Sequence, residues 1–303
     1  DLQGFWTNST ITPLERPAEL GTRLVISADE AKKIEAQNQQ FAEESDAPTD
    51  PKLKTQDLPH SCGLGFTGAD CGYNHFWIDR GQEVITVNGE RRSSLIIEPP
   101  DGKVPMLPER RKLLGQRMLA MRQNFDGPEA RPLAERCLMA FGSSSGPPML
   151  PVLYNTHYQI VQNKDTVMIL VEMVHDARVV RMGGPHLPQA LRKWMGDSVG
   201  RWEGDTLVVE TTNFTQKETF RGSTENLKVS ERFTRVAPDK MIYRVTIEDS
   251  GAFSQPWSIE YPFYATNEPI YEYACHEGNY ALPGILAGAR ADEKAKAATS
   301  GGQ

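Results

Sequence analysis

The 303-residue sequence predicts a mainly β protein, an antiparallel up-and-down barrel with helical insertions in its N-terminal half. Two observations favour this fold. From Tyr158 onward, at least six short segments alternate apolar and polar residues. Tight turns such as Glu203-Gly204-Asp205 and Ala237-Pro238-Asp239 join successive segments as a meander. A meander of this length most simply closes into a barrel, because closure pairs the exposed edges, and an open sandwich is the competing architecture.

Residues 1–25 are expected to contribute the first barrel strand, because "LQGFWTN" resembles a Gly-x-Trp strand opening. A surface helix is predicted to follow, with Ser27 and Glu30 as its capping box. "EVITV", the Asn88-Gly89 turn and "SSLIIE" indicate strands that include a hairpin.

Further helices are expected over 108–122 and 130–140. Residues 26–150 are therefore assigned to a helix- and loop-rich insertion, or lid, with a β-hairpin, that wraps one end of the barrel. A separate subdomain is the alternative.

Residues 151–290 are predicted to form the barrel meander. "YQIVQ" and "TVMILVEMVHDARVV" flank the turn at 163–165 and indicate one long hairpin. A short helix is expected near "PQALRKWM", and "IYEYACHE" at 270–277 is taken as the last strand. Residues 291–303 are expected to form a flexible tail.

Composition and motifs exclude several classes of function. The net charge of −7 argues against a nucleic-acid partner, because phosphate binding needs clustered Lys and Arg. No apolar run approaches the roughly 20 residues of a membrane-spanning helix. The sequence contains no Walker loop, H-E-x-x-H or C-x-x-C motif. We therefore expect no cofactor and no metal.

The cysteines favour an oxidising compartment, periplasmic or secreted. Cys62 and Cys71 flank a glycine-rich loop that would bring them within bridging range. If they pair, Cys137 and Cys275 either pair with each other or stay free. The sequence begins at Asp1 without a methionine, as it would after removal of a signal peptide or a tag.

Glu231 is the leading candidate for a catalytic base. In "LKVSERFTR" it shares a face with apolar residues, so it is predicted to point into the barrel. An inward carboxylate either serves as an acid or base or forms a structural ion pair with an inward Arg. The other candidate catalytic residues are Glu272, His175, His276 and Arg178. A metal site built from these histidines and carboxylates lacks any H-x-H or H-x-x-x-H spacing, and we do not predict one.

Aromatic and polar residues expected near the barrel mouth are candidate ligand-binding residues, since they can stack on a flat molecule and hydrogen-bond its edges. These residues are Trp77, Tyr154, Tyr158, Arg201, Trp202 and Tyr271.

A wider combination of segments resembles a widespread group of secreted bacterial proteins. The segments run over nearly the whole chain and include "LQGFWTNSTITPLERP", "YNHFWIDRG", "EMVHDARVV", "GRWEGDTLVVETTNF" and "IYEYACHEGNYALPGILAGAR". The resemblance implies a calycin- or lipocalin-like barrel and an extracytoplasmic location. It assigns no activity to any residue.

Two functions are consistent with these observations. The first is a periplasmic or secreted enzyme, namely a lyase, isomerase or hydrolase that acts on a small apolar or aromatic molecule by cofactor-independent acid–base chemistry. The second is a non-catalytic, lipocalin-like protein that binds such a molecule. A structural protein with a filled barrel is a third possibility.

Overall fold

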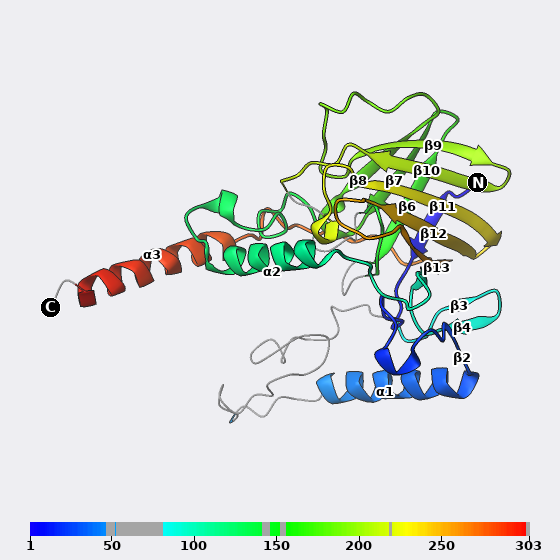
Figure 1. Cartoon of the computed structure of the whole chain (residues 1–303), viewed down its shortest axis with the longest axis horizontal. Coiled ribbons are helices and arrows are strands. Elements are labelled where there is room, and N and C mark those ends of the chain that lie inside the picture. Colours follow the sequence, from blue (N-terminus) through cyan, green and yellow to red (C-terminus); the bar gives the residue numbers. More distant parts are fainter. Residues whose placement is uncertain (47–51, 53–80, 141–145, 152–155, 218–219, 301–303) are drawn as a thin grey trace.

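The structure is a computed structural model that describes residues 1–46, 52, 81–140, 146–151, 156–217 and 220–300. A closed barrel of nine strands dominates it (Figure 1). The barrel strands are β1 (Gly4–Thr7), β6 (His157–Gln162), β7 (Thr166–Val171), β8 (Ala177–Met182), β9 (Asp197–Glu203), β10 (Thr206–Thr212), β11 (Lys228–Ala237), β12 (Lys240–Glu248) and β13 (Trp257–Ala265). Strand β1 pairs with both β6 and β13 and so closes the barrel.

The barrel is mixed, so the purely antiparallel up-and-down prediction is wrong in one place. Strands β8 and β9 pair in parallel, and residues 183–196 cross from the end of one to the start of the other. The short helix expected in this crossover is absent. Backbone groups of Leu187 and Lys193 bond instead to Asp197 and Asn213, which holds the segment against the barrel.

The long strand predicted over "TVMILVEMVHDARVV" is two strands. Strands β7 and β8 pair with each other, and the 3₁₀ turn η6 (Met173–His175) reverses the chain between them. Val174 has a φ of 59°, and the Val171 amide donates to the Asp176 carbonyl across the turn. Asp176 is a turn-favouring residue at this reversal, but no Gly, Pro or Asn accompanies it, so the local signal is weak.

Two features predicted for the N-terminal half, a helix capping box and a hairpin turn, are confirmed. Ser27 and Glu30 exchange the two hydrogen bonds of a capping box, at 3.2 and 2.8 Å, at the start of α1 (Ala28–Asp46). Asn88 and Gly89 both have positive φ in the turn between the β3 and β4 strands.

This hairpin belongs to a small separate sheet ordered β2-β4-β3, while β5 adds to the edge of β13. The bounds of these strands are β2 (Val25–Ile26), β3 (Thr86–Val87), β4 (Glu90–Arg92) and β5 (Ile96–Glu98).

Two longer helices, α2 (Pro108–Gln123) and α3 (Ala281–Ser300), extend away from the barrel (Figure 1). The helix expected over 130–140 is reduced to the 3₁₀ turn η5 (Pro128–Ala130) and non-helical turns. Two further 3₁₀ turns among the described residues are η1 (Ala18–Leu20) and η7 (Phe220–Gly222). None of the helices in the described ranges is long and apolar enough to cross a membrane.

The final strand predicted over 270–277 is absent, because residues 266–280 form loops and turns. The free edge of β13 is already taken, by β1 at Tyr264 and Ala265 and by β5 at Ser258 and Ile259. Among the described residues, both ends of this edge of β13 are therefore already paired, and 270–277 do not pair with it. Helix α3 then occupies most of the segment expected to be a flexible tail.

Cys137 and Cys275 form a disulfide whose Cα atoms are 5.7 Å apart. This confirms the alternative in which these two cysteines pair, while Cys62 and Cys71 lie outside the described residues. The bond joins the segment after α2 to the loop after the barrel. A disulfide in the folded chain is consistent with an oxidising extracytoplasmic compartment.

The double substitution C137S/C275S should lower the free energy of unfolding by roughly 4 to 5 kcal/mol, because the bond closes a loop of 138 residues in the unfolded chain. Guanidinium unfolding of the variant and the wild type, both without reductant, measures this difference. Equal midpoints would contradict the expectation.

Candidate functional site in the barrel interior

An ion pair between Arg178 and Glu231 lies inside the barrel. The Arg178 Nη1 and Nη2 atoms lie 2.6 and 3.0 Å from the two carboxylate oxygens of Glu231. The side chains are 2% and 0% exposed. Glu231 faces inward between Val229 and Phe233, as the alternation predicts, and Arg178 reaches it from β8 on another part of the wall. The sequence allowed two roles for Glu231, an acid or base and a structural ion pair with an inward Arg. This geometry matches the second.

Three tyrosines and an asparagine complete what we call the interior polar cluster. The Tyr243 hydroxyl donates to Glu231 Oε1 at 2.8 Å. Tyr261 is the direct cross-strand partner of Tyr243. The Asn8 amide donates to the hydroxyls of Tyr158 and Tyr261, at 3.3 and 3.4 Å. The interior polar cluster thus consists of Asn8, Tyr158, Arg178, Glu231, Tyr243 and Tyr261, all buried.

The backbone of residues 146–151 contacts this cluster. The Met149 amide donates to the Tyr243 hydroxyl at 3.1 Å, and the Tyr261 hydroxyl donates to the Met149 carbonyl. The Met149 side chain is buried in the core of the barrel, together with Leu150. One peptide residue is therefore held on both its polar groups by two tyrosines from neighbouring strands.

The cluster is electrically neutral overall. Burial raises the pKa of each of the three tyrosines, so their hydroxyls stay protonated. Burial opposes the charge of Arg178, but the adjacent Glu231 carboxylate more than offsets this and raises the pKa of the guanidinium. One positive and one negative charge then remain, and they are paired with each other.

Two polar atoms of the cluster keep unused hydrogen-bonding capacity. Asn8 Oδ1 and Arg178 Nε are buried and have no hydrogen-bond partner among the described residues. A buried group without a partner costs about 1–3 kcal/mol, and Arg16 Nε, Arg92 Nε and Trp257 Nε1 outside the cluster are in the same position.

Glu231 is poorly placed to act as a base in this arrangement. Its Oε1 accepts hydrogen bonds from Arg178 and Tyr243, and its Oε2 accepts one from Arg178. Both oxygens are engaged, and the carboxylate is screened from solvent. Three of the roughly four lone-pair positions of the carboxylate are thus occupied.

The other predicted catalytic residues do not join this cluster. Glu272 and His276 are exposed in the loop after β13, and Glu272 lines a hollow of about 430 Å³ beside the disulfide. His175 belongs to η6, and its side chain lies outside the described atoms. Two other histidines each lie between two carboxylates. One is His186, described below, and the other is His157, which lies 3.4 Å from Glu172 and 3.1 Å from Glu268.

The predicted ligand-binding residues are dispersed. Only Tyr158 among those that the structure describes lies in the interior polar cluster. Trp202 is 40% exposed and lines a hollow of about 710 Å³ at one end of the barrel, and Arg201 pairs with Glu203 on the surface. Tyr271 is 69% exposed. Trp77 and Tyr154 fall outside the described residues.

Across the described ranges, no group of three or more His, Cys, Asp or Glu side chains is arranged to hold a metal ion.

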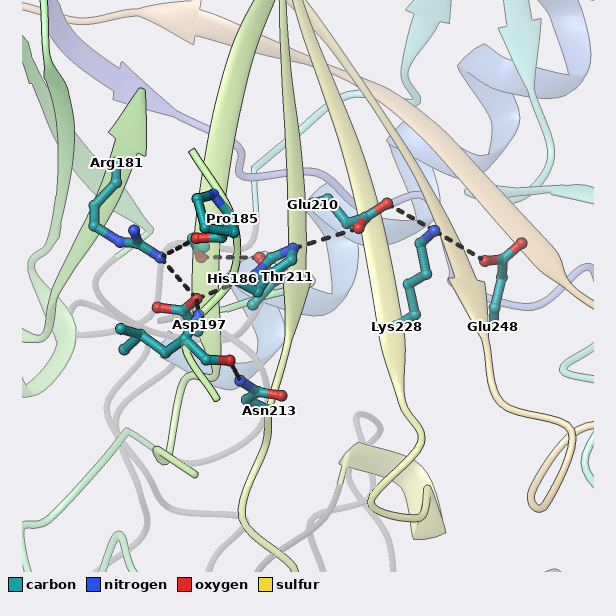
Figure 2. A network of polar contacts seen from close by, with 11 residues as sticks. Arg181, Pro185, His186, Asp197, Glu210, Thr211, Asn213, Lys228 and Glu248 are labelled. Carbon is teal, nitrogen blue, oxygen red and sulfur yellow. Dashed lines mark hydrogen bonds and ion pairs between the residues drawn. The ribbon is translucent and has the colours of Figure 1, made fainter. Parts of the chain in front are cut away.

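A second polar network, on the outer face of the barrel, was missed by the sequence reasoning (Figure 2). His186 in the crossover lies between Asp197 and Glu210, with its ring nitrogens 3.1 and 3.3 Å from their carboxylates. Arg181 also donates to Asp197, at 2.9 Å, and Lys228 lies 2.6 Å from Glu210. No local motif marks these residues, because they meet only once the crossover folds back onto β9 and β10.

Asp197 is the anchor of this network and is 2% exposed. Burial disfavours its charged form, but hydrogen bonds from the Leu187 amide, His186 and Arg181 outweigh that penalty and lower the pKa of the carboxyl. Each of these donors lies in β8 or in the crossover. The network therefore clamps the parallel β8–β9 connection and leaves neither nitrogen of His186 free for catalysis.

The strand pairings define a closed, mixed β-barrel with a polar cluster in its interior. No family model matches the chain, and no curated protein matches it. Two solved structures of the fluorescent protein UnaG, each with a single substitution, are similar to part of it. Each has 15% sequence identity and a TM-score of 0.23, and the match covers 37% of this chain and 72% of the UnaG chain. At this level the likeness carries no argument about ligand or activity.

Breaking the interior ion pair should destabilise the protein more than removing it entirely. R178M or E231L alone should cost roughly 3–5 kcal/mol, because each leaves a buried charge unpaired. The double variant R178M/E231L should cost less than either single change. Urea unfolding of the four proteins measures the cycle, and additive losses would contradict a coupled pair.

Asp197 should stabilise the protein only above acidic pH. Its folded-state pKa is lowered, so its contribution is present above the unfolded-state pKa, near 3.9, and is lost as the pH falls through the folded-state value. The stability difference between wild type and D197N should therefore be large at pH 7 and shrink below about pH 4. Asp205, exposed in the β9–β10 turn, supplies the control variant D205N, for which urea unfolding should show little change at either pH.

Proposed function

We propose that this protein is a lipocalin-like barrel that binds a small, mostly apolar molecule, and that the interior polar cluster receives the polar group of that molecule. The observation that supports the proposal is a buried Arg–Glu pair among three tyrosine hydroxyls in a largely apolar interior. Replacing a buried ion pair by apolar side chains is often neutral or stabilising. Stability alone therefore gives little reason for this pair, whereas ligand recognition does.

The contacts of Glu231 favour binding over acid–base catalysis. A general base needs a free lone pair within reach of the proton that it abstracts. Glu231 instead shares its oxygens with Arg178 and Tyr243, and none of the predicted histidine partners that the structure describes approaches it. The enzymatic function thus remains the less supported alternative. The compartment that we propose is periplasmic or secreted, in keeping with the Cys137–Cys275 bond.

The charge balance of the interior provides the test. N-phenyl-1-naphthylamine and 8-anilinonaphthalene-1-sulfonate differ by one sulfonate and report binding by fluorescence. The wild type should bind the neutral probe more tightly, because a buried anion would compete with Glu231 for Arg178. E231Q frees the charge of Arg178 and should shift the ratio of the two dissociation constants at least 10-fold toward the sulfonate.

Two controls accompany this test. E248Q removes a carboxylate from the outer face of the neighbouring strand and should leave the ratio unchanged. If E231Q does not fold, Y158F replaces it: loss of this interior hydroxyl should weaken binding of the neutral probe, whereas Y264F, on the partly exposed Tyr264, should not. The proposal fails if the wild type shows no saturable binding, or if E231Q and E248Q behave alike.

A further inference from the structure

Resting on the proposed function, the contacts of Met149 identify the class of ligand. The backbone N–H and carbonyl of Met149 both form hydrogen bonds with the interior polar cluster, through Tyr243 and Tyr261. These two tyrosines are cross-strand partners in the middle of β12 and β13, and both are fully buried. The cluster is thus arranged to bind one donor and one acceptor at the spacing of a peptide residue.

Apart from the backbone groups of Met149, the segment contributes mainly buried apolar side chains. Pro147, Pro148, Met149 and Leu150 are all buried, and Met149 and Leu150 belong to the same core as the barrel strands. The segment belongs to none of the barrel strands. It therefore fills space that the nine strands enclose without taking part in their pairing.

Because the cluster carries no net charge, it limits which ligand could take the place of Met149 in the site. A carboxylate ligand would add a negative charge next to Glu231 and leave the buried site with a net charge, which is costly. A neutral amide would add none and would keep the Arg178–Glu231 pair intact. The unpartnered Asn8 Oδ1, buried beside Tyr261, offers one further acceptor for an N–H group.

We propose that residues 146–151 occupy the binding site as an internal ligand, and that the external ligand is a neutral, peptide-like amide with an apolar side chain, which displaces Met149 from Tyr243 and Tyr261. Binding then competes with docking of the segment. The apparent affinity equals the intrinsic affinity multiplied by the fraction of molecules whose segment is undocked. Weakening the segment's packing should therefore tighten ligand binding.

The first arm of the experiment compares two compounds as competitors of N-phenyl-1-naphthylamine. N-acetyl-L-methionine amide and N-acetyl-L-methionine differ only in a neutral amide against a carboxylate. At pH 7 the amide should displace the probe at a concentration at least 10-fold lower than the acid does. Equal displacement by the two compounds would overturn the assignment of ligand class.

The second arm weakens the segment. M149A keeps the backbone amide but removes the buried side chain, and it should tighten binding of the amide at least 10-fold. Met241 on β12 is equally buried and lies outside the segment, so M241A is the matched control and should bind the amide no more tightly than the wild type. If both variants tighten binding equally, a general cavity effect replaces displacement and the inference fails.

Hydrogen exchange on the wild type decides the matter if M149A does not fold. Saturating amide should speed exchange of the Met149 and Leu150 amides while the amides of β12 stay protected. Unchanged or slower exchange at Met149 would overturn displacement. Suppose that the wild type binds the neutral probe and that E231Q shifts the ratio of dissociation constants as expected, but that M149A does not tighten binding of the amide. This inference then fails and the proposed function stands. If neither the wild type nor M149A binds any of the compounds, the proposed function fails as well.

Discussion

Closure of the barrel is the constraint on which the rest of the structure depends. Strand β1 is only four residues long, yet it pairs with β6 along its length and with the end of β13. These contacts join residues near the start of the chain to residues about 150 and about 260 positions later. Once the ring is closed, the inward face of every strand is shielded from water, and each inward polar group must find a partner inside.

Most inward polar groups belong to one compact group of side chains, and Ser198 and Thr211 form a separate hydrogen bond. Arg178 and Glu231 neutralise each other, and the tyrosine hydroxyls link the pair to Asn8 and to the backbone of Met149. The result is a polar spot on an aromatic and aliphatic background, which is the usual make-up of a small-molecule site. The same hydrogen bonds occupy the carboxylate of Glu231, which is otherwise the leading candidate for a catalytic base.

The parallel pair β8–β9 introduces a second dependence. An antiparallel hairpin needs only a short turn, whereas a parallel connection must carry the chain back to the same end of the sheet. Here the return segment is held without helical structure. Asp197 accepts hydrogen bonds from several of its groups at once, and His186 extends the network to Glu210. The crossover thus replaces regular secondary structure with charged contacts to the outer wall.

The sequence by itself determined the features that depend on neighbouring residues. These include the capping box of α1, the Asn88-Gly89 hairpin, most of the strands and the inward direction of Glu231, because each follows from spacing along a short stretch. Only the tertiary structure decided the parallel crossover, the reversal at Val174 and the absence of a strand over 270–277. The partner of Glu231 and the place of Met149 were decided in the same way. Those features depend on which edges are already paired and on which residues meet across the barrel, and such contacts between distant positions leave no periodic signal in one sequence.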